Sequence, residues 1–139
     1  MTSPTHWLLK TEPSTYSLAD LRKDKRTNWD GIRNYQARNF LRLIKKGDLA
    51  LIYHSGDERS VVGIARVIKE AYPDPDPRKK GDWVQVDLEF MKALDFPVRL
   101  DQIKTRTAIQ SLPLLKQSRL SVMRITSAHY QTILKMGGN

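Results

Sequence analysis

Apolar residues along this chain gather in short runs separated by polar turns, a pattern typical of strands. The run at 49–54 is continuous, as in a buried strand, whereas the run at 83–90 alternates with polar residues, as in a half-buried one. Gly63 interrupts another run and indicates a β-bulge or a close backbone approach. The predicted strands cover residues 7–10, 49–54, 60–68, 83–90 and 119–125.

Capping residues and the spacing of apolar residues predict the helices. Ser17 is followed three residues later by Asp20, a helix start of the capping-box type. Asn34 is a good N-cap for a second helix, which has one apolar face for packing and one polar face free for a ligand. The apolar face holds Ala37, Phe40, Leu41 and Ile44, and the polar face holds Tyr35, Arg38, Arg42 and Lys46. Further helical segments are predicted at 100–103, 113–117 and 126–134.

These elements predict an α+β domain. Five to six mostly antiparallel strands with a few short helices favour a small curved sheet or barrel with helices near its rim. The proline-rich stretch 73–81 is predicted as an exposed loop between two strands. The sequence has neither regular strand–helix alternation nor a G-x-G-x-x-G pattern, which argues against a doubly wound dinucleotide-binding fold. A length of 139 residues predicts one domain over 1–139.

The charge of the chain favours an acidic partner. Lys and Arg number 24 against 15 Asp and Glu, which gives a net charge of +9. Residues 101–139 hold six of the basic residues and one acidic residue, so more than half of the excess lies there. Nucleic acid is the expected partner for such a charge, although the charge is also compatible with a role in solubility alone.

Missing residue types and patterns exclude several classes of chemistry. The chain has no cysteine, which excludes disulfides, thiolate zinc sites and cysteine nucleophiles. His6, His54 and His129 lie far apart without H-x-x-x-H spacing, so we expect no metal and no cofactor. The N-terminus lacks a signal-peptide pattern, and no apolar run approaches the roughly 20 residues of a membrane span. We therefore expect a soluble intracellular protein of the cytoplasm.

Residues 28–39 hold the densest group of candidate binding residues. Aromatic, amide and arginine side chains alternate there around a tight turn and a helix start. A nucleobase needs a flat apolar face and directional hydrogen bonds, which these types supply. Trp29, Tyr35 and Tyr53 are candidate pocket walls, with core packing as the alternative for each. The polar neighbours of Trp29 weaken that alternative at its position.

Four polar residues in the same segment supply the directional part of this hypothesis. They are Arg33, Asn34, Gln36 and Arg38. Amides match the donor and acceptor of a base edge, and arginine suits phosphate or guanine. The alternatives are that Asn34 only caps its helix and that Arg38 is a solvated surface residue. Capping and ligand binding are compatible, because a helix N-terminus also attracts anions.

Two other polar groups complete the set of candidates. His54 and Ser55 follow an apolar strand, so their side chains are predicted at the rim of the sheet. Ser55 lacks nucleophile-elbow surroundings and an acid partner, which argues against a catalytic serine–histidine pair. Arg119 lies near Ser121 at a predicted strand start, and these residues either approach a ligand closely or form an ordinary turn.

Seven ordered segments, spread nearly from end to end of the chain, resemble the EVE domain family. They are residues 7–13 (WLLKTEP), 29–39 (WDGIRNYQARN), 46–48 (KGD), 53–55 (YHS), 63–65 (GIA), 69–74 (KEAYPD) and 118–122 (SRLSV). The resemblance implies a fold of the PUA-like superfamily, a small β-barrel with peripheral helices, related to ASCH and YTH domains. It further implies a pocket for a modified nucleobase in DNA or RNA, usually proposed to be methylated or hydroxymethylated cytosine, with no established catalysis.

The resemblance also suggests which residues take part. Around the pocket it suggests Trp29, Asn34, Tyr35, Gln36, Tyr53, His54, Ser55 and Ser121. Toward the nucleic-acid backbone it suggests Lys10, Arg33, Arg38 and Arg119. The function expected from the sequence is therefore a non-enzymatic reader of a modified base. The alternatives are an RNA-binding module acting in RNA modification or processing and an enzyme acting on a modified nucleotide through His54.

Overall fold

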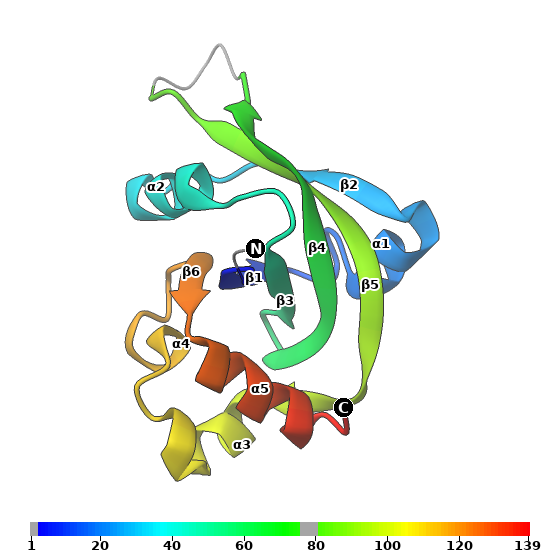
Figure 1. Ribbon diagram of the computed structural model, residues 1–139, viewed down its shortest axis with the longest axis vertical. Helices are drawn as coiled ribbons and strands as arrows, with labels where there is room; N and C mark the ends of the chain where they lie inside the picture. The colour runs from blue at the N-terminus through cyan, green and yellow to red at the C-terminus, as the bar shows by residue number, and fades with distance from the viewer. Residues whose placement is uncertain (1–2, 76–80) are drawn as a thin grey trace.

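A computed structural model describes residues 3–75 and 81–139, which form a strongly curved sheet with helices at its rim (Figure 1). The strands are β1 (His6–Thr11), β2 (Arg26–Trp29), β3 (Leu49–His54), β4 (Ser60–Pro73), β5 (Val84–Arg99) and β6 (Val122–Ile125). They pair in the order β2-β5-β4-β3-β1-β6. All neighbours are antiparallel except β1 and β3, which run parallel. The structure therefore confirms the α+β class and the mostly antiparallel sheet.

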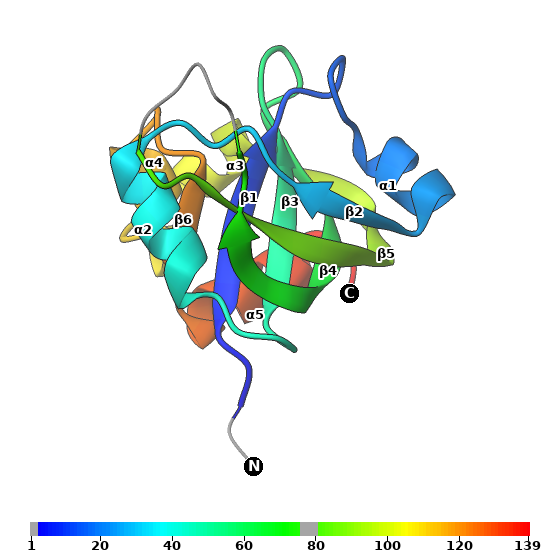
Figure 2. The same ribbon diagram turned by 90° about the horizontal axis from the view of Figure 1, so that it is seen from above.

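The helices occupy separate places around the sheet. They are α1 (Leu18–Asp24), α2 (Tyr35–Leu43), α3 (Leu100–Thr105), the 3₁₀ helix η1 (Thr107–Ile109), α4 (Pro113–Lys116) and α5 (Ser127–Met136). Helices α1 and α2 lie at opposite sides of the sheet (Figure 2), whereas α3, α4 and α5 lie together beside β6 (Figure 1). None of the helices in residues 3–75 and 81–139 has the length and apolar character needed to cross a membrane.

The predicted helix caps are confirmed. The Ser17 hydroxyl accepts from the Asp20 amide, and the Asp20 carboxylate accepts from the Ser17 amide in return. The Asn34 side chain accepts from the Ala37 amide at 2.9 Å and so begins α2. These bonds satisfy amides that a helix start otherwise leaves without partners. Both helices therefore begin where the sequence predicts.

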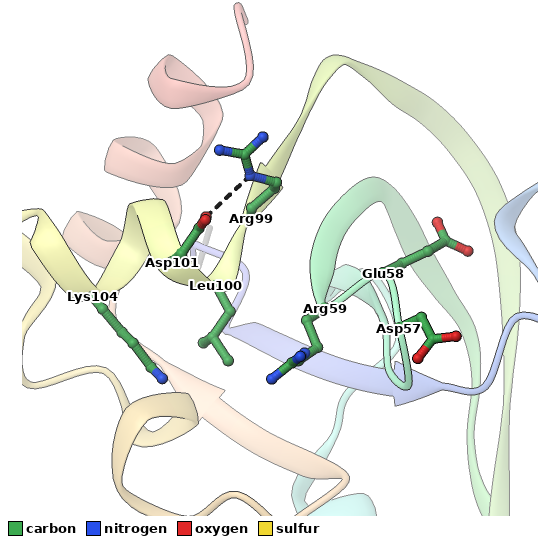
Figure 3. Close-up of a pocket in the computed structure, with 7 residues that line it drawn as sticks. All are labelled: Asp57, Glu58, Arg59, Arg99, Leu100, Asp101 and Lys104. Carbon is green, nitrogen blue, oxygen red and sulfur yellow. Dashed lines mark hydrogen bonds and ion pairs between the residues drawn. The ribbon is translucent and has the colours of Figure 1, made fainter.

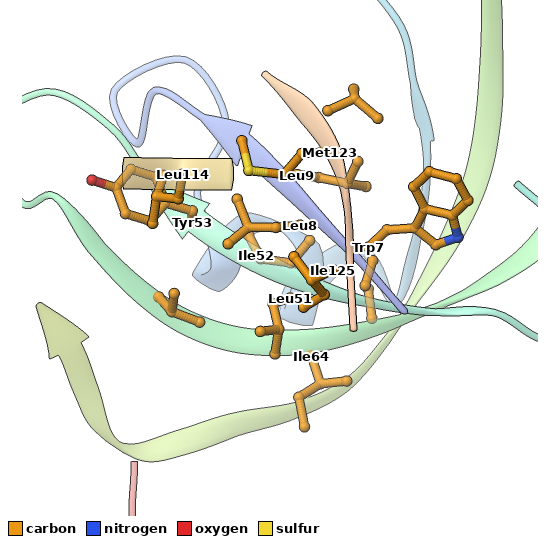
Figure 4. Close-up of a cluster of buried hydrophobic side chains, with 14 of the residues drawn as sticks. Trp7, Leu8, Leu9, Leu51, Ile52, Tyr53, Ile64, Leu114, Met123 and Ile125 are labelled. Carbon is orange, nitrogen blue, oxygen red and sulfur yellow. The ribbon is translucent and has the colours of Figure 1, made fainter. Parts of the chain in front are cut away.

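The core lies on the concave side of the curved sheet and is built mainly on β1 and β3 (Figure 4). Trp7, Leu8 and Leu9 are almost fully buried, as are Leu51 and Ile52 on the neighbouring strand. Burial on both faces explains why these strands appear in the sequence as continuous apolar runs. Their parallel pairing requires a crossover, and the connection from β1 to β3 contains α1, β2 and α2.

Three strand predictions need correction. Strands β4 and β5 are longer than predicted, 14 and 16 residues, and the predicted strand 119–125 is ordered as a strand only from Val122. Strand β2 was not predicted, because this four-residue edge strand buries only Trp29 and therefore shows no clear alternation. The predicted loop 73–81 lies partly on residues 76–80, outside the described residues.

Register shifts between β4 and β5 give the sheet its curvature. Shifts occur at four places along this pair, one of them between Val61 and Gly63. A Cβ added at Gly63 would lie 2.6 Å from Leu18 Cδ2 and 2.9 Å from the Lys92 carbonyl oxygen, so both roles predicted for this glycine are present. Within the described residues no ladder joins β2 to β6, so the sheet is barrel-like but open.

A buried carboxylate fixes the start of β1. Asp48 is 4% exposed and precedes β3. One of its oxygens accepts from the Thr5 amide at 3.0 Å, and the other accepts from Trp7 Nε1 and from the Lys45 amide, both at 2.9 Å. Three donors from both sides of the β1–β3 pair thus bond to one carboxylate. Hydrogen bonds to a carboxylate are stronger than those between neutral groups.

We expect the substitution Asp48→Ala to lower the free energy of unfolding by about 3 kcal/mol or more, because it leaves three partly or fully buried donors without an acceptor. Asp48→Asn should cost less, since an amide oxygen still accepts. Urea denaturation of both variants measures the effect, with the exposed Asp95→Ala as a control that should change stability by less than about 0.5 kcal/mol. A loss below about 1 kcal/mol for Asp48→Ala would contradict this role.

Candidate functional site

A cleft of about 500 Å³ opens where the end of β1 meets β2. Its lining comes from the end of β1, the loop before α1, strand β2 with the turn that follows it, and the residue before β6. The lining residues are Lys10, Thr11, Glu12, Thr15, Tyr16, Thr27, Asn28, Trp29, Asp30, Gly31, Ile32 and Ser121. This volume lies within the range of small-ligand sites, and the lining combines apolar surface with several hydrogen-bonding groups.

Aromatic and apolar side chains form one wall of the cleft. Trp29 is the last residue of β2, pairs in register with Val86 and is 7% exposed. The Tyr16 ring meets the Trp29 ring edge-on, with centroids 6.3 Å apart and planes at 84°. Ile32 is buried and also lines the cleft. A flat, rigid surface of this kind suits the face of a planar ligand.

The polar side chains of the cleft are partly fixed by their own partners. Asn28 Nδ2 donates to Gln85 Oε1 at 2.9 Å, and Gln85 in turn donates to the Pro73 carbonyl, which ties β2 to β5 and β4. The Tyr16 hydroxyl donates to Asp24 at 2.8 Å. Burial raises the pKa of the Tyr16 phenol, so it remains a donor. The rim is thus held in place by the surrounding strands.

Lys10 supplies the positive charge of the cleft. Its Nζ donates to the Ser118 carbonyl at 2.8 Å and lies 5.7 Å from the centroid of the Tyr53 ring. The Lys10 amide donates to the Ser121 carbonyl at 2.9 Å, which holds the segment before β6 beside the cleft. Partial burial lowers the pKa of the Lys10 ammonium. A desolvated cation at this place favours an anionic or electron-rich group nearby.

The turn after Trp29 is anchored by a single carboxylate. Gly31 has φ +78°, a conformation that favours glycine, and its amide donates to Asp74 Oδ2 at 2.9 Å. Arg33 Nη1 donates to the same oxygen at 2.9 Å. Burial of Asp74 would raise the pKa of its carboxyl, but the bonds from Arg33 and Gly31 outweigh burial and hold that pKa below its ordinary value.

A second cluster of aromatic and arginine side chains lies at the start of α2. Tyr35 is 60% exposed and stacks on the buried Trp83, with centroids 5.1 Å apart and planes at 30°. The Arg38 guanidinium lies 4.9 Å from the Tyr35 ring and 5.7 Å from the Trp83 ring. Arg33 also lies over Trp83, at 5.6 Å. This cluster offers an exposed aromatic ring beside two cations.

The structure distributes the sequence-predicted residues over several places. Lys10, Trp29 and Ser121 line the cleft together. Tyr35, Arg33 and Arg38 form the second cluster, whereas Asn34 caps α2 and Gln36 and Arg119 are exposed. The remaining three, Tyr53, His54 and Ser55, lie at the end of β3 and are not among the lining residues.

The residues at the end of β3 hold neighbouring segments in place. His54 Nε2 accepts from the Leu18 amide at 3.0 Å, and His54 Nδ1 lies 3.1 Å from Glu58 Oε1. The Ser55 hydroxyl donates to the Thr11 carbonyl at 3.3 Å. Both ring nitrogens of the buried His54 therefore have partners within the protein. These bonds position the loop that forms one side of the cleft.

Sequence reasoning did not single out most of the cleft's polar lining. Thr27 lies on the unpredicted strand β2, and Tyr16 lies in the short loop before α1, whereas Asn28 belongs to the candidate segment 28–39 without an assigned role. Glu12 belongs to the segment WLLKTEP, which carries part of the family resemblance, and this was the available signal for it. A Cβ added at Gly56 would lie 2.6 Å from Glu12 Oε2, so Glu12 packs against the β3–β4 turn.

The curved mixed sheet with helices at its rim agrees with the PUA-like fold that the family resemblance implies. The EVE domain model matches residues 5–136, and the chain belongs to the EVE domain family. The chain is 33% identical to human thymocyte nuclear protein 1, over 95% of this chain and 73% of that protein.

Two solved structures extend this comparison. A hypothetical protein from Leishmania major has a TM-score of 0.93 and 37% identity, covering 98% of this chain and 96% of that one. The human THYN1 protein in complex with DNA containing 5-methylcytosine has a TM-score of 0.88 and 32% identity, covering 97% of this chain and 98% of that one. The similarity therefore extends over nearly the whole domain in each case.

We expect Asp74→Asn to lower the free energy of unfolding by about 1–2 kcal/mol at neutral pH, because it removes a charge-assisted acceptor shared by Arg33 and Gly31. The folded-state pKa of Asp74 is below the ordinary value of 3.8. Its contribution is therefore complete above that value and is lost as the pH falls through the folded-state pKa.

Urea denaturation of parent and variant across the acid range measures this difference. The parent and Asp74→Asn should converge in stability as the pH falls below 3.8. The exposed Asp57→Asn serves as the control and should show no such convergence. A stability difference for Asp74→Asn that stays constant down to low pH would contradict the assignment.

Proposed function

We propose that this chain is a nucleic-acid-binding module that takes a modified base of the 5-methylcytosine type into the cleft beside Trp29. The observation that carries the proposal is the end-to-end similarity to human THYN1 protein, whose structure contains 5-methylcytosine DNA. The net charge of +9 supports a polyanionic partner. The cleft supports it independently, because its lining has the chemistry that a single extruded base requires.

The aromatic wall receives the face of the base. Stacking of a base on an aromatic ring contributes about 1–3 kcal/mol, and Trp29 presents the largest ring in the cleft. A methyl group on the base gains from contact with apolar surface, which Ile32 extends beyond Trp29. Extrusion from a duplex costs a few kcal/mol, which stacking and two or three hydrogen bonds offset.

The polar lining distinguishes cytosine from thymine, which has a carbonyl oxygen where cytosine has an amino group. The exocyclic amino group of cytosine is a donor, and a carboxylate is the side chain that accepts from it in known pairings. Glu12 is exposed and lines the cleft, so it is the proposed acceptor. Hydroxyls of Thr15 and Ser121 are the proposed partners of the remaining base edge. Lys10 provides positive charge for the adjoining phosphate or for a carbonyl oxygen of the base.

The other sequence-predicted residues have supporting roles in this proposal. The exposed cluster of Tyr35 and Arg38 is available to the flanking nucleic acid, with Gln36 beside it on α2. Asn34 positions α2, and Arg33 positions the turn at Gly31 through Asp74. Tyr53, His54 and Ser55 support the cleft from the end of β3, and Arg119 is exposed two residues before Ser121.

A catalytic role for His54 has less support. Both of its ring nitrogens have partners within the protein, so proton transfer to a ligand would require those bonds to break. An RNA strand offers the same base and phosphate chemistry as a DNA strand. Comparing the affinities for matched DNA and RNA strands distinguishes the two ligands. The cytoplasmic location expected from the sequence stays a prediction.

We expect Trp29→Ala to weaken binding of an oligonucleotide that contains 5-methylcytosine by at least about tenfold, because it removes the stacking surface. Trp29→Phe should retain part of the affinity. Fluorescence anisotropy with matched methylated and unmethylated DNA and RNA measures the effect, and a thermal melt verifies folding of each variant. If the folded Trp29→Phe and Trp29→Ala proteins both bind as tightly as the parent, the base does not enter this cleft.

Glu12→Gln tests the reading of the base edge without removing a buried group. We expect it to reduce discrimination between methylated cytosine and thymine by about 1–3 kcal/mol, because an amide oxygen is a weaker acceptor than a carboxylate. The same binding assay serves, with Glu70→Gln as a control that lies outside the cleft. Unchanged base preference in the Glu12 variant would assign the edge contact to another residue.

A further inference from the structure

A smaller cavity lies between the β3–β4 turn and α3 (Figure 3). Its volume is about 270 Å³. The turn contributes one side, and the end of β5 with the start of α3 contributes the other. The lining residues are Asp57, Glu58, Arg59, Arg99, Leu100, Asp101 and Lys104. Nothing in the proposed base-binding role uses this second cavity.

Two of the three cations that line this cavity make no ion pair with the described residues, although three carboxylates also line it. Arg99 Nε donates to Asp101 Oδ1 at 3.1 Å, and Glu58 is engaged by His54 at 3.1 Å. Within residues 3–75 and 81–139, neither Arg59 nor Lys104 makes an ion pair. Figure 3 shows the Arg59 and Lys104 side chains extending on either side of Leu100 toward the same side, away from the carboxylates of Asp57 and Glu58.

The backbone holds Arg59 in an unusual conformation. Its φ is +42°, in the left-handed region where glycine or asparagine is favoured. The Arg59 carbonyl accepts from the Leu100 amide at 2.8 Å, which fixes the turn against the end of β5. An arginine at such a position costs conformational free energy that glycine would avoid, and residues of this kind concentrate at functional sites.

The β3–β4 turn lies between the second cavity and the base cleft, because Asp57, Glu58 and Arg59 line the cavity and Gly56 lies against Glu12 of the cleft. The Lys10 ammonium lies over one part of the Tyr53 ring, at 5.7 Å from the centroid. Burial raises the pKa of Tyr53, and the nearby charge of Arg59 partly offsets that rise. The turn also packs against Glu12 at Gly56. Lys10 and Arg59 thus both act on Tyr53, and Lys104 lines the same cavity as Arg59.

We propose that Arg59 and Lys104 bind a phosphodiester group of the nucleic-acid strand whose base occupies the Trp29 cleft. This inference rests on the proposed function. A guanidinium and an ammonium that line one cavity and extend toward the same side match a phosphate, which carries a negative charge and several acceptor oxygens. Contacts to phosphate position a strand but carry no information about the base. Loss of this site therefore weakens methylated and unmethylated strands equally.

The test is the salt dependence of oligonucleotide binding by the double variant Arg59→Gln/Lys104→Gln. Each lost phosphate contact reduces the slope of log affinity against log salt by about 0.7 on a single strand and about 0.9 on a duplex. Because both side chains bind one phosphodiester group, we expect a reduction of about 0.7 to 0.9 for the pair, with an unchanged ratio of affinities for methylated and unmethylated strands. Lys92→Gln/Lys135→Gln removes the same charge from residues that line neither cavity.

Two further measurements make the result decisive. One uses variants that keep the charge, and the other uses free phosphate in place of the strand. Arg59→Lys/Lys104→Arg should keep the parental slope. Inorganic phosphate alone, titrated by calorimetry, should bind far more weakly than the oligonucleotide. The inference is overturned if the glutamine pair keeps the parental slope, if the Lys92/Lys135 control loses as much, or if free phosphate binds as tightly as the strand.

The result also separates this inference from the proposed function. A reduced slope in the glutamine pair, together with a parent protein that has no preference for methylated bases, supports the phosphate site and rejects the base-reading role. A parental slope in the pair, together with loss of preference in the Trp29 variants, rejects the phosphate site and keeps the reader. A parent protein that binds no oligonucleotide rejects both.

Discussion

The buried carboxylate of Asp48 is the constraint on which the arrangement of this domain depends. It accepts from the Trp7 indole and from backbone amides on both sides, so β1 and β3 share one fixed starting point. From there the parallel ladder sets Lys10 beside Tyr53 and Thr11 beside His54. The cleft lies at the far end of this ladder, and an error of register at Asp48 would displace the part of its lining that β1 contributes. Two segments of the family resemblance, WLLKTEP and KGD, are therefore the two halves of one interaction.

Much of the fold was predictable because its signals are local. Continuous apolar runs predict the buried strands, and the side chains of Ser17 and Asn34 mark the helix starts. The missed features depend on tertiary contacts. Strand β2 exists because β5 offers it a partner along Arg26–Trp29, and the length of β5 depends on bulges that no short window of sequence reveals. The parallel pairing of β1 and β3 likewise has no local signature.

In the candidate site, too, local patterns were visible in the sequence and tertiary contacts were not. The alternation of aromatic, amide and arginine residues drew attention to 28–39, and the structure separates that segment into two surfaces. Trp29 faces the cleft, whereas Tyr35 stacks on Trp83 outside it. The residue types alone do not show which surface each side chain faces, because a tight turn at Gly31 changes the direction of the chain between Trp29 and Tyr35. The contribution of Ser121 depends on its pairing with Lys10, a contact between opposite ends of the chain. Local patterns identify such residues as polar candidates but do not bring them together.

The strand that ends at Trp29 is an edge strand with a single neighbour. Strand β2 pairs with β5 alone within the described residues, while the anchored pair β1 and β3 lies in the interior of the sheet. The wall of the cleft and the centre of the fold are thus carried by different parts of the molecule. Substitutions along β2 can change the width and chemistry of the cleft while the centre remains intact. Ligand preference can therefore diverge among proteins with this architecture through the less buried residues of β2, whereas Trp29 belongs to the core cluster and its replacement also costs free energy of folding.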